Sequence, residues 1–65
     1  MNNNINVWIA KSRMSKKEVA KRLGVSHIVL SRWINGHSMP SLINAMKLAR
    51  ILDCKVDDLY KLEDE

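Results

Sequence analysis

The sequence predicts an all-α fold of five short helices with no β-sheet. Apolar residues recur at helical spacing along the chain, and no segment shows the strict apolar–polar alternation of a half-buried strand. Serine or asparagine precedes four of the five apolar segments, where a side-chain oxygen can cap the first turn of a helix. Glycine or proline lies between several of these segments, as helix ends and loops require.

The 65 residues are expected to form a single domain spanning 1–65, near the lower size limit for folding without disulfides or metals. Cys54 is the only cysteine, so an internal disulfide is impossible, and a reducing cytoplasm is the expected location. We interpret Cys54 as a small buried apolar residue. No apolar stretch approaches the roughly 20 residues of a membrane span, and residues 1–4 lack the positive flank and apolar run of a secretion signal.

The first helix is expected at about 4–12, with an asparagine as its cap. Ser15 caps the second helix, and Glu18 follows three residues later, which is the S-x-x-E pattern of a reciprocal capping box. Gly24 ends the second helix, because glycine adopts the positive φ that a helix-ending turn requires. The apolar stripe of the first helix consists of Ile5, Trp8 and Ile9.

Residues 16–35 have the pattern of two short helices joined by a tight turn. The second of these helices is capped by Ser26 and ends at 35–36, where asparagine and glycine follow each other. Ala20 is small where the two helices cross, and Val25 fills the corner between them. This unit is a helix-turn-helix, which in small basic proteins usually places its second helix in the major groove of DNA. The apolar residues that face each other are Val19, Ala20 and Leu23 on the first helix and Leu30, Trp33 and Ile34 on the second.

Two further helices are expected after this unit. Residues 37–40 form a loop, because Pro40 disfavours the helical conformation in the residue before it. Ser41 caps a fourth helix, and a short fifth helix follows 53–55. The apolar repeat of these two helices consists of Leu42, Ala45, Leu48, Ala49, Leu52, Val56 and Leu59. The predicted structural core around the helix-turn-helix consists of Trp8, Ile9, Ala20, Leu23, Val25, Leu30, Trp33 and Ile34.

Positive charge is concentrated in the body of the chain. The formal net charge is +4, and Glu18 is the only acidic residue between Lys11 and Arg50. Acidic residues dominate from Asp53 onward, and 61–65 is expected to be an acidic C-terminal tail. A basic body with an acidic end suits a protein whose body meets a polyanion such as nucleic acid. A solvated charged surface without such a partner is the alternative.

The outward face of the helix expected after Ser26 carries neither an acid nor a lysine. The Arg32 guanidinium can pair with O6 and N7 of guanine, a contact worth about 1–3 kcal/mol of discrimination. Ile28 fits against a thymine methyl group, and Ser31 is short enough to let the helix lie deep in the groove. For each residue taken singly, an ordinary exposed surface position is the alternative. We predict that the base-reading residues are His27, Ile28, Ser31 and Arg32.

The residues around this face are expected to contact phosphates. Lys16 and Lys17 lie at the start of the second helix, where free backbone N–H groups and the helix dipole favour an anion. Lys21 and Arg22 lie further away and add only to the long-range field. Such contacts set affinity and register without reading sequence. The predicted phosphate-binding residues are Ser15, Lys16, Lys17, Asn35, His37, Ser38 and Ser41.

The order of these signals resembles the phage repressor and Cro-like helix-turn-helix family, a lambda-repressor-like group often called Xre-type regulators. The resemblance implies a compact five-helix domain that binds DNA, commonly as a homodimer on a two-fold operator, and acts as a transcriptional regulator, in particular a repressor of the phage or mobile-element type. It places base contacts on the four residues named above, and phosphate contacts on Lys16, Asn35 and the following loop. The matching runs are Met-Ser-Lys-Lys-Glu-Val-Ala (14–20), Leu-Gly-Val-Ser (23–26), Ser-Arg-Trp-Ile-Asn-Gly (31–36), Pro-Ser-Leu (40–42) and Val-Asp-Asp-Leu (56–59).

Two positions depart from the family pattern. Many relatives pair an Arg in the first helix with a Glu near the end of the third, whereas the matching residues here are Ile9 and Ile34. We predict that Ile9 packs against Ile34, because an apolar pair that replaces a buried ion pair is often neutral or stabilising by about 1–4 kcal/mol. Relatives often have Gly after the first helix, where Arg13 at a positive φ would cost about 1 kcal/mol or more. Arg13 then either contacts a phosphate or is an ordinary surface residue.

No enzyme activity, cofactor or metal site is expected. His27 and His37 are separated by a whole helix, and the chain contains no C-x-x-C, H-x-x-x-H or Ser-His-Asp arrangement and no glycine-rich phosphate loop. The alternative function is a protein-interaction module of the same fold, such as an antitoxin or an anti-repressor-type adaptor. Exposed Ile28 and Met39 would suit a protein interface as well as a DNA groove. The surface of a dimer is not fixed by the sequence, and its candidates are the loop around Met39 and the C-terminal residues Leu59, Tyr60 and Leu62.

Overall fold

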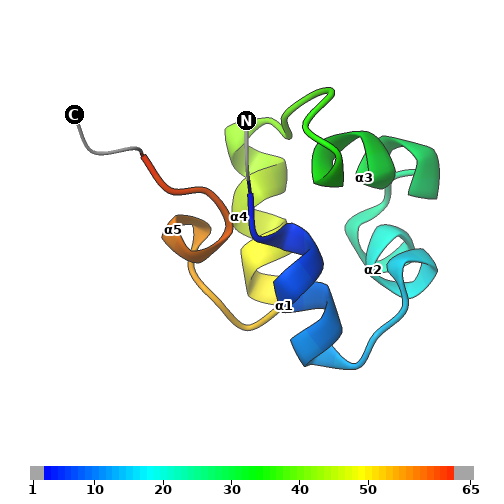
Figure 1. Ribbon diagram of the computed structural model, residues 1–65. Helices are drawn as coiled ribbons and strands as arrows, with labels where there is room; N and C mark the ends of the chain where they lie inside the picture. Colours follow the sequence, from blue (N-terminus) through cyan, green and yellow to red (C-terminus); the bar gives the residue numbers. More distant parts are fainter. Residues whose placement is uncertain (1–2, 63–65) are drawn as a thin grey trace.

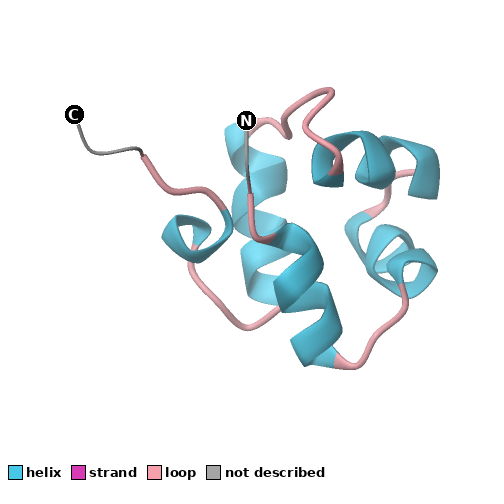
Figure 2. Ribbon diagram, in the orientation of Figure 1, coloured by secondary structure: helices cyan, strands magenta, loops and turns pink. Residues whose placement is uncertain are grey.

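The computed structural model describes residues 3–62, and within this range every regular element is a helix (Figure 2). The prediction of an all-α fold with five helices is confirmed. The acidic residues 63–65 of the expected C-terminal tail lie outside the described residues. No helix within 3–62 is long and apolar enough to cross a membrane. The helices are α1 (Ile5–Ser12), α2 (Lys16–Leu23), α3 (His27–Ile34), α4 (Leu42–Ile51) and α5 (Val56–Leu59).

Helix α4 runs through the middle of the fold (Figure 1). It packs against α2 on one side and against α5 on the other, while α2 also packs against α3. Each of the five helices contributes one fully buried aliphatic side chain to the shared core, so no helix buries its apolar face alone. These five side chains are Ile5, Val19, Leu30, Leu48 and Leu59.

The residues predicted for the core lie at two levels of burial. Five of them are buried, and the other three are half-buried and pack against the buried cluster. Leu42, which belongs to the apolar repeat of α4, is instead 72% exposed, because it lies in the first turn on the outer side of the helix. The buried members are Ile9, Ala20, Leu23, Leu30 and Trp33, and the half-buried ones are Trp8, Val25 and Ile34.

The asparagine cap predicted for α1 is made by Asn3 and not by Asn4. Asn4 makes no side-chain cap hydrogen bond, and its backbone angles are not the extended ones of a capping residue. Asn3 performs this role, because its Oδ1 accepts a hydrogen bond from the backbone N–H of Ile5 at 3.0 Å. Asn4 is used across the fold instead: its backbone N–H donates to the Leu59 carbonyl at 2.8 Å, and its Nδ2 to the Asp58 carbonyl at 3.3 Å.

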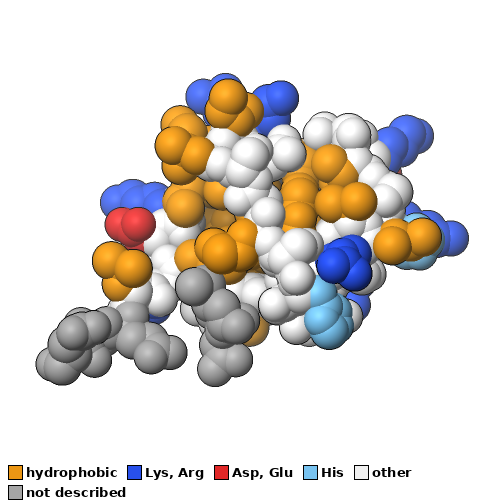
Figure 3. All heavy atoms as spheres, turned by 90° about the horizontal axis from the view of Figure 1, so that it is seen from above, with side chains coloured by type: hydrophobic (Ala, Val, Ile, Leu, Met, Phe, Trp, Pro, Cys, Tyr) orange, Lys and Arg blue, Asp and Glu red, His pale blue; other side chains and the backbone are white. Residues whose placement is uncertain are grey.

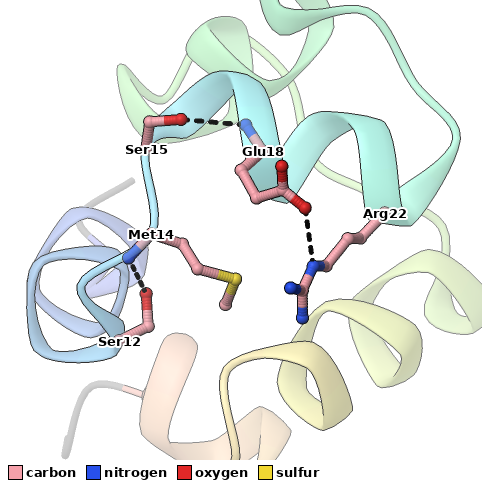
Figure 4. A network of polar contacts seen from close by, with 5 residues as sticks. All are labelled: Ser12, Met14, Ser15, Glu18 and Arg22. Carbon is pink, nitrogen blue, oxygen red and sulfur yellow. Dashed lines mark hydrogen bonds and ion pairs between the residues drawn. The ribbon is translucent and has the colours of Figure 1, made fainter.

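The turn between α1 and α2 contains a strained residue. Arg13 has φ 63°, as the comparison with glycine-containing relatives predicts. Ser12 supports the turn, because its Oγ donates to the Ile9 carbonyl at 2.6 Å and accepts from the Met14 N–H at 3.1 Å (Figure 4). Asp53, after α4, is the second non-glycine residue with a positive φ within 3–62, at 57°.

Only half of the predicted capping box forms at the start of α2. Ser15 Oγ accepts from the Glu18 N–H at 3.1 Å, as predicted (Figure 4). The Glu18 carboxylate does not return to the Ser15 backbone and instead accepts from Arg22 Nε at 2.8 Å, one helical turn further on. This hydrogen bond lowers the pKa of the Glu18 carboxyl, and slight desolvation of the carboxyl opposes the effect.

Gly24 forms the turn of the helix-turn-helix with φ 85°. Its N–H donates to the Ala20 carbonyl at 2.8 Å, and the Val25 N–H donates to the same carbonyl at 3.0 Å, so the end of α2 is satisfied by the turn itself. A Cβ built on Gly24 would meet no other atom within 4 Å. The positive φ, and not a lack of space, therefore requires glycine at this position.

The α4–α5 turn corrects the interpretation of Cys54, which is only partly buried. Burial raises the pKa of the Cys54 thiol, and the neighbouring Asp58 and Asp53 carboxylates add to this shift. The thiol is therefore protonated at neutral pH and is a poor nucleophile. Asp58 also caps α5, because its Oδ2 accepts from the Lys55 N–H at 2.9 Å.

A double-mutant cycle tests the predicted packing of Ile9 on Ile34. Ile9→Val is expected to lower the free energy of unfolding by about 0.5–1.5 kcal/mol, because the side chain is 4% exposed. Ile34→Ala is expected to cost stability as well, since Ile34 packs against the core. If the two side chains touch, the double variant should deviate from additivity by about 0.5 kcal/mol or more in urea unfolding. Strict additivity would contradict the predicted contact.

Candidate nucleic-acid interface

Helix α3 is held from behind and open in front. Ser26 caps it, with Oγ accepting from the Val29 N–H at 3.2 Å. Leu30 and Trp33 are buried on its inner side, so the position of the helix is fixed by the core. At 1.5 Å per residue, its eight residues are about 12 Å long. With its side chains an α-helix is about 10–12 Å across, which matches the width of a B-DNA major groove, about 12 Å.

The residues predicted to read bases lie together on the outer side of α3. Ile28 is 64% exposed. Exposed His27 and Arg32 lie on the same side, and Ser31 is half-buried between them and the core. Among residues 3–62, no acidic side chain belongs to α3 or to the loop that follows it. The structure thus brings all four side chains to one accessible, acid-free surface.

The loop after α3 is folded back onto the end of the helix. The N–H of His37 donates to the Arg32 carbonyl at 2.9 Å, and the N–H of Ser38 to the same carbonyl at 3.4 Å. Gly36 makes this reversal possible with φ 79°. The side chains of Asn35 and His37 are therefore exposed beside the outer side of α3, and that of Ser38 is half-buried.

The remaining predicted phosphate contacts come from two helix N-termini. Ser15, Lys16 and Lys17 are exposed at the start of α2, and Ser41 is exposed at the start of α4. The Ser15 and Ser41 hydroxyl oxygens accept backbone N–H groups at 3.1 and 3.2 Å. A hydroxyl that accepts in this way keeps its own proton to donate, so both caps remain able to bind a phosphate oxygen.

The charges of the fold are separated in space. Within 3–62, Glu18 and Arg22 form the one ion pair, so the other cations of the chain body are not neutralised by a close carboxylate. The acids Asp53, Asp57 and Asp58 all lie in α5 or the turn before it. Seen from above, Lys, Arg and His side chains appear along the edge formed by α2 and α3, and the acidic side chain that is prominent in this view lies on the opposite edge, next to a Lys or Arg side chain (Figure 3).

Two features near this surface were not found from the sequence. Asn3 reaches the C-terminal end of α3, which no local pattern indicates. Exposed apolar side chains cluster on the outer side of α4 and in the loop before it, and we call these residues, Met39, Leu42, Ile43 and Met46, the α4 stripe. The helical wheel contains a signal for this stripe, because 43 and 46 lie away from the core positions 45, 48, 49 and 52.

No three His, Cys, Asp or Glu side chains within the described range lie close enough together to hold a metal ion. The arrangement of α2 and α3 instead consists of a rigid helix pair with a polar, cationic outer surface.

A helix-turn-helix family model matches residues 9–59 of this chain. The chain belongs to the helix-turn-helix family. Uncharacterized HTH-type transcriptional regulators are similar to it over its full length. One from Archaeoglobus fulgidus is 34% identical over 100% of this chain and 92% of its own. Another, from Methanocaldococcus jannaschii, is 31% identical over 100% of this chain and 98% of its own.

Solved structures of this helix-turn-helix type have the same arrangement of helices. The P22 c2 repressor, crystallised in complex with a synthetic operator, superposes with a TM-score of 0.81 at 28% identity, covering 88% of this chain and 86% of the repressor chain. The SOS-response repressor LexA of Eubacterium rectale superposes with a TM-score of 0.78 at 32% identity, covering 95% of this chain and 69% of that one. The phage-repressor-like fold predicted from the matching sequence segments is confirmed.

Proposed function

We propose that this helix-turn-helix protein is a sequence-specific regulator of transcription, acting as a repressor, that binds double-stranded DNA by placing α3 in the major groove. The observation that carries this proposal is the exposed, acid-free outer face of α3, anchored from behind by Leu30 and Trp33. The names of its relatives and the operator complex of the P22 c2 repressor support the same function. It acts by binding, in the cytoplasm, and not by catalysis.

The roles of the surface residues follow from their chemistry. Arg32 reads guanine through a two-pronged hydrogen bond, and Ile28 contacts a thymine methyl group. His27 and Ser31 complete the base-reading set. The phosphate contacts on both sides of α3 fix its register on the duplex, and they come from Ser15, Lys16, Lys17, Asn35, His37, Ser38 and Ser41.

Salt dependence separates DNA binding from the alternative of a protein-binding adaptor. We expect a gel shift on random duplex at 50 mM salt, and an affinity loss on the order of 10³-fold by 200 mM, because phosphate contacts release counterions. A protein-binding module of the same fold would have no need to bind DNA. Absence of a shift at 50 mM salt would therefore favour the adaptor.

Two single variants separate reading from phosphate binding. Arg32→Ala should reduce the preference for the selected operator over random duplex by about 1–3 kcal/mol, with little change in non-specific affinity. Lys16→Ala should weaken binding to all duplexes alike and reduce the salt slope by about one. The affinities are measured by titrating each variant with the selected operator and with random duplex. Equal effects of the two variants on both duplexes would mean that α3 is not the reader.

We further propose that the protein binds its operator as a homodimer through the α4 stripe. The four stripe residues are each 57–72% exposed, and three of them lie on the outer side of α4, next to the exposed cations Lys47 and Arg50. A cluster of exposed large apolar side chains is a common mark of a protein–protein contact. Figure 3, which looks onto the N-terminal end of α4, shows apolar side chains gathered there beside Lys and Arg side chains.

A second copy of the chain fits this stripe better than a large partner does. The stripe has four apolar residues, against about 20–30 residues on each side of a standard stable interface. It also borders a shallow groove of about 300 Å³ whose lining includes the cations Lys47 and Arg50. Two copies would repel each other through these cations, so the contact is weak. The stripe also begins at Met39, directly after Ser38, which is proposed to contact a phosphate. Two copies joined through the stripe therefore lie against the same DNA. The dimer therefore forms on the operator, with its reading helices about 34 Å apart.

Ile43→Glu is expected to abolish cooperative filling of a two-fold operator, because it places two carboxylates in the apolar contact. Binding of one copy to a half-site should change little. Val7→Glu is the matched control, since Val7 is an equally accessible apolar residue on α1. Gel shifts with full and half operators measure both effects. Retained cooperativity in the Ile43→Glu variant would exclude the α4 stripe as the dimer surface.

A further inference from the structure

The side chain of Asn3 joins the beginning of α1 to the end of α3. Its Nδ2 lies 3.0 Å from the Trp33 carbonyl oxygen and 3.4 Å from that of Ile34. Its Oδ1 accepts from the Ile5 N–H at 3.0 Å. One amide therefore accepts from a backbone N–H at a helix start and donates to the carbonyls at a helix end that lies 30 residues away. Only a side chain with both a donor and an acceptor can make both contacts.

The carbonyl groups that Asn3 contacts belong to the turn that carries the reading surface. Trp33 follows Arg32 directly, and the Trp33 carbonyl also accepts from the Gly36 N–H at 3.1 Å. The Arg32 carbonyl accepts two further hydrogen bonds from the loop after α3, from the N–H groups of His37 and Ser38. Asn3 is thus part of one hydrogen-bonded set that fixes the last turn of α3 and the loop after it.

Asn4 makes the equivalent connection to a different helix. Its backbone and side chain donate to the carbonyls of Leu59 and Asp58 at the end of α5. Neighbouring asparagines at the start of α1 therefore tie it to two different helices, and only the tie of Asn3 leads to the reading surface. This pair supplies a matched comparison, since both side chains make half-buried hydrogen bonds over a long sequence separation.

We propose that Asn3 is a positioning residue for base reading: it fixes the C-terminal turn of α3 against α1 so that Arg32 meets the base edges in one orientation. Bidentate recognition requires its donors to be held within about 0.5 Å of the productive geometry by supporting contacts. Non-specific phosphate binding tolerates larger displacements. The proposal rests on the proposed function, because it concerns how α3 discriminates between DNA sequences.

The first test compares Asn3→Ala with Asn4→Ala on an operator selected from a random DNA pool. We expect Asn3→Ala to lower the ratio of specific to non-specific affinity by about three- to tenfold, the size of one lost hydrogen bond. Asn4→Ala should lower the melting temperature to a similar extent and leave the ratio unchanged. Asn3→Asp, which keeps the acceptor for Ile5 and loses the donor, should behave like Asn3→Ala. Both titrations are made at a temperature at which all variants are folded.

Amide hydrogen exchange provides a second readout that needs no DNA. Asn3→Ala should accelerate exchange at the N–H groups of Gly36, His37 and Ser38, and Asn4→Ala should accelerate it around Tyr60 instead. An unchanged affinity ratio in Asn3→Ala, or equal losses in the two alanine variants, would overturn the proposal. A wild-type protein without any sequence preference would overturn the proposed function itself, and the exchange data would then still decide whether Asn3 fixes the end of α3.

Discussion

The burial of Leu30 and Trp33 is the contact on which the rest of the structure depends. A helix of eight residues such as α3 is too short to be stable alone in water, because the first turn is costly to form. Packing of its inner side against the core therefore both creates the helix and orients it. The outer side of the helix, with Arg32 and Ile28, does not take part in the core and is exposed to solvent.

The same core also separates the charges of the molecule. Five of the nine basic residues between Lys11 and Arg50 lie on α2 and α3. The other four basic residues are Lys11, Arg13, Lys47 and Arg50, on or next to α1 and on α4. The described acids after Arg50, by contrast, lie on α5 or in the turn before it. Glu18 is the exception, and its pairing with Arg22 neutralises a single cation. The electrostatic field around α3 therefore stays positive, and no further structural feature is needed to keep acidic side chains away from this helix.

Many relatives pair an Arg in the first helix with a Glu in the third, and here Ile9 and Ile34 take these positions. The polar link between the two helices lies elsewhere in this protein. Ile9 is buried and Ile34 packs against the core, so neither leaves an unpaired charge. The polar link is made instead by Asn3, outside α1, on the backbone of α3 and not on a side chain. Arg13 retains a strained conformation that relatives with glycine avoid, and the hydrogen bonds of Ser12 support the turn that contains it.

The sequence by itself determined most features that depend on neighbours within about four residues, and the Glu18 carboxylate, which pairs with Arg22 and not with the Ser15 backbone, is an exception. The five helices, the Ser15, Ser26 and Ser41 caps and the positive φ of Gly24 follow from local spacing, because their hydrogen bonds close within one turn. Only the tertiary structure decided the use of Asn3 and Asn4. The contacts of Asn3 and Asn4 depend on which distant backbone groups the core brings together, and no local period in the sequence encodes that choice, whereas the helical wheel of α4 already places 43 and 46 away from the core positions.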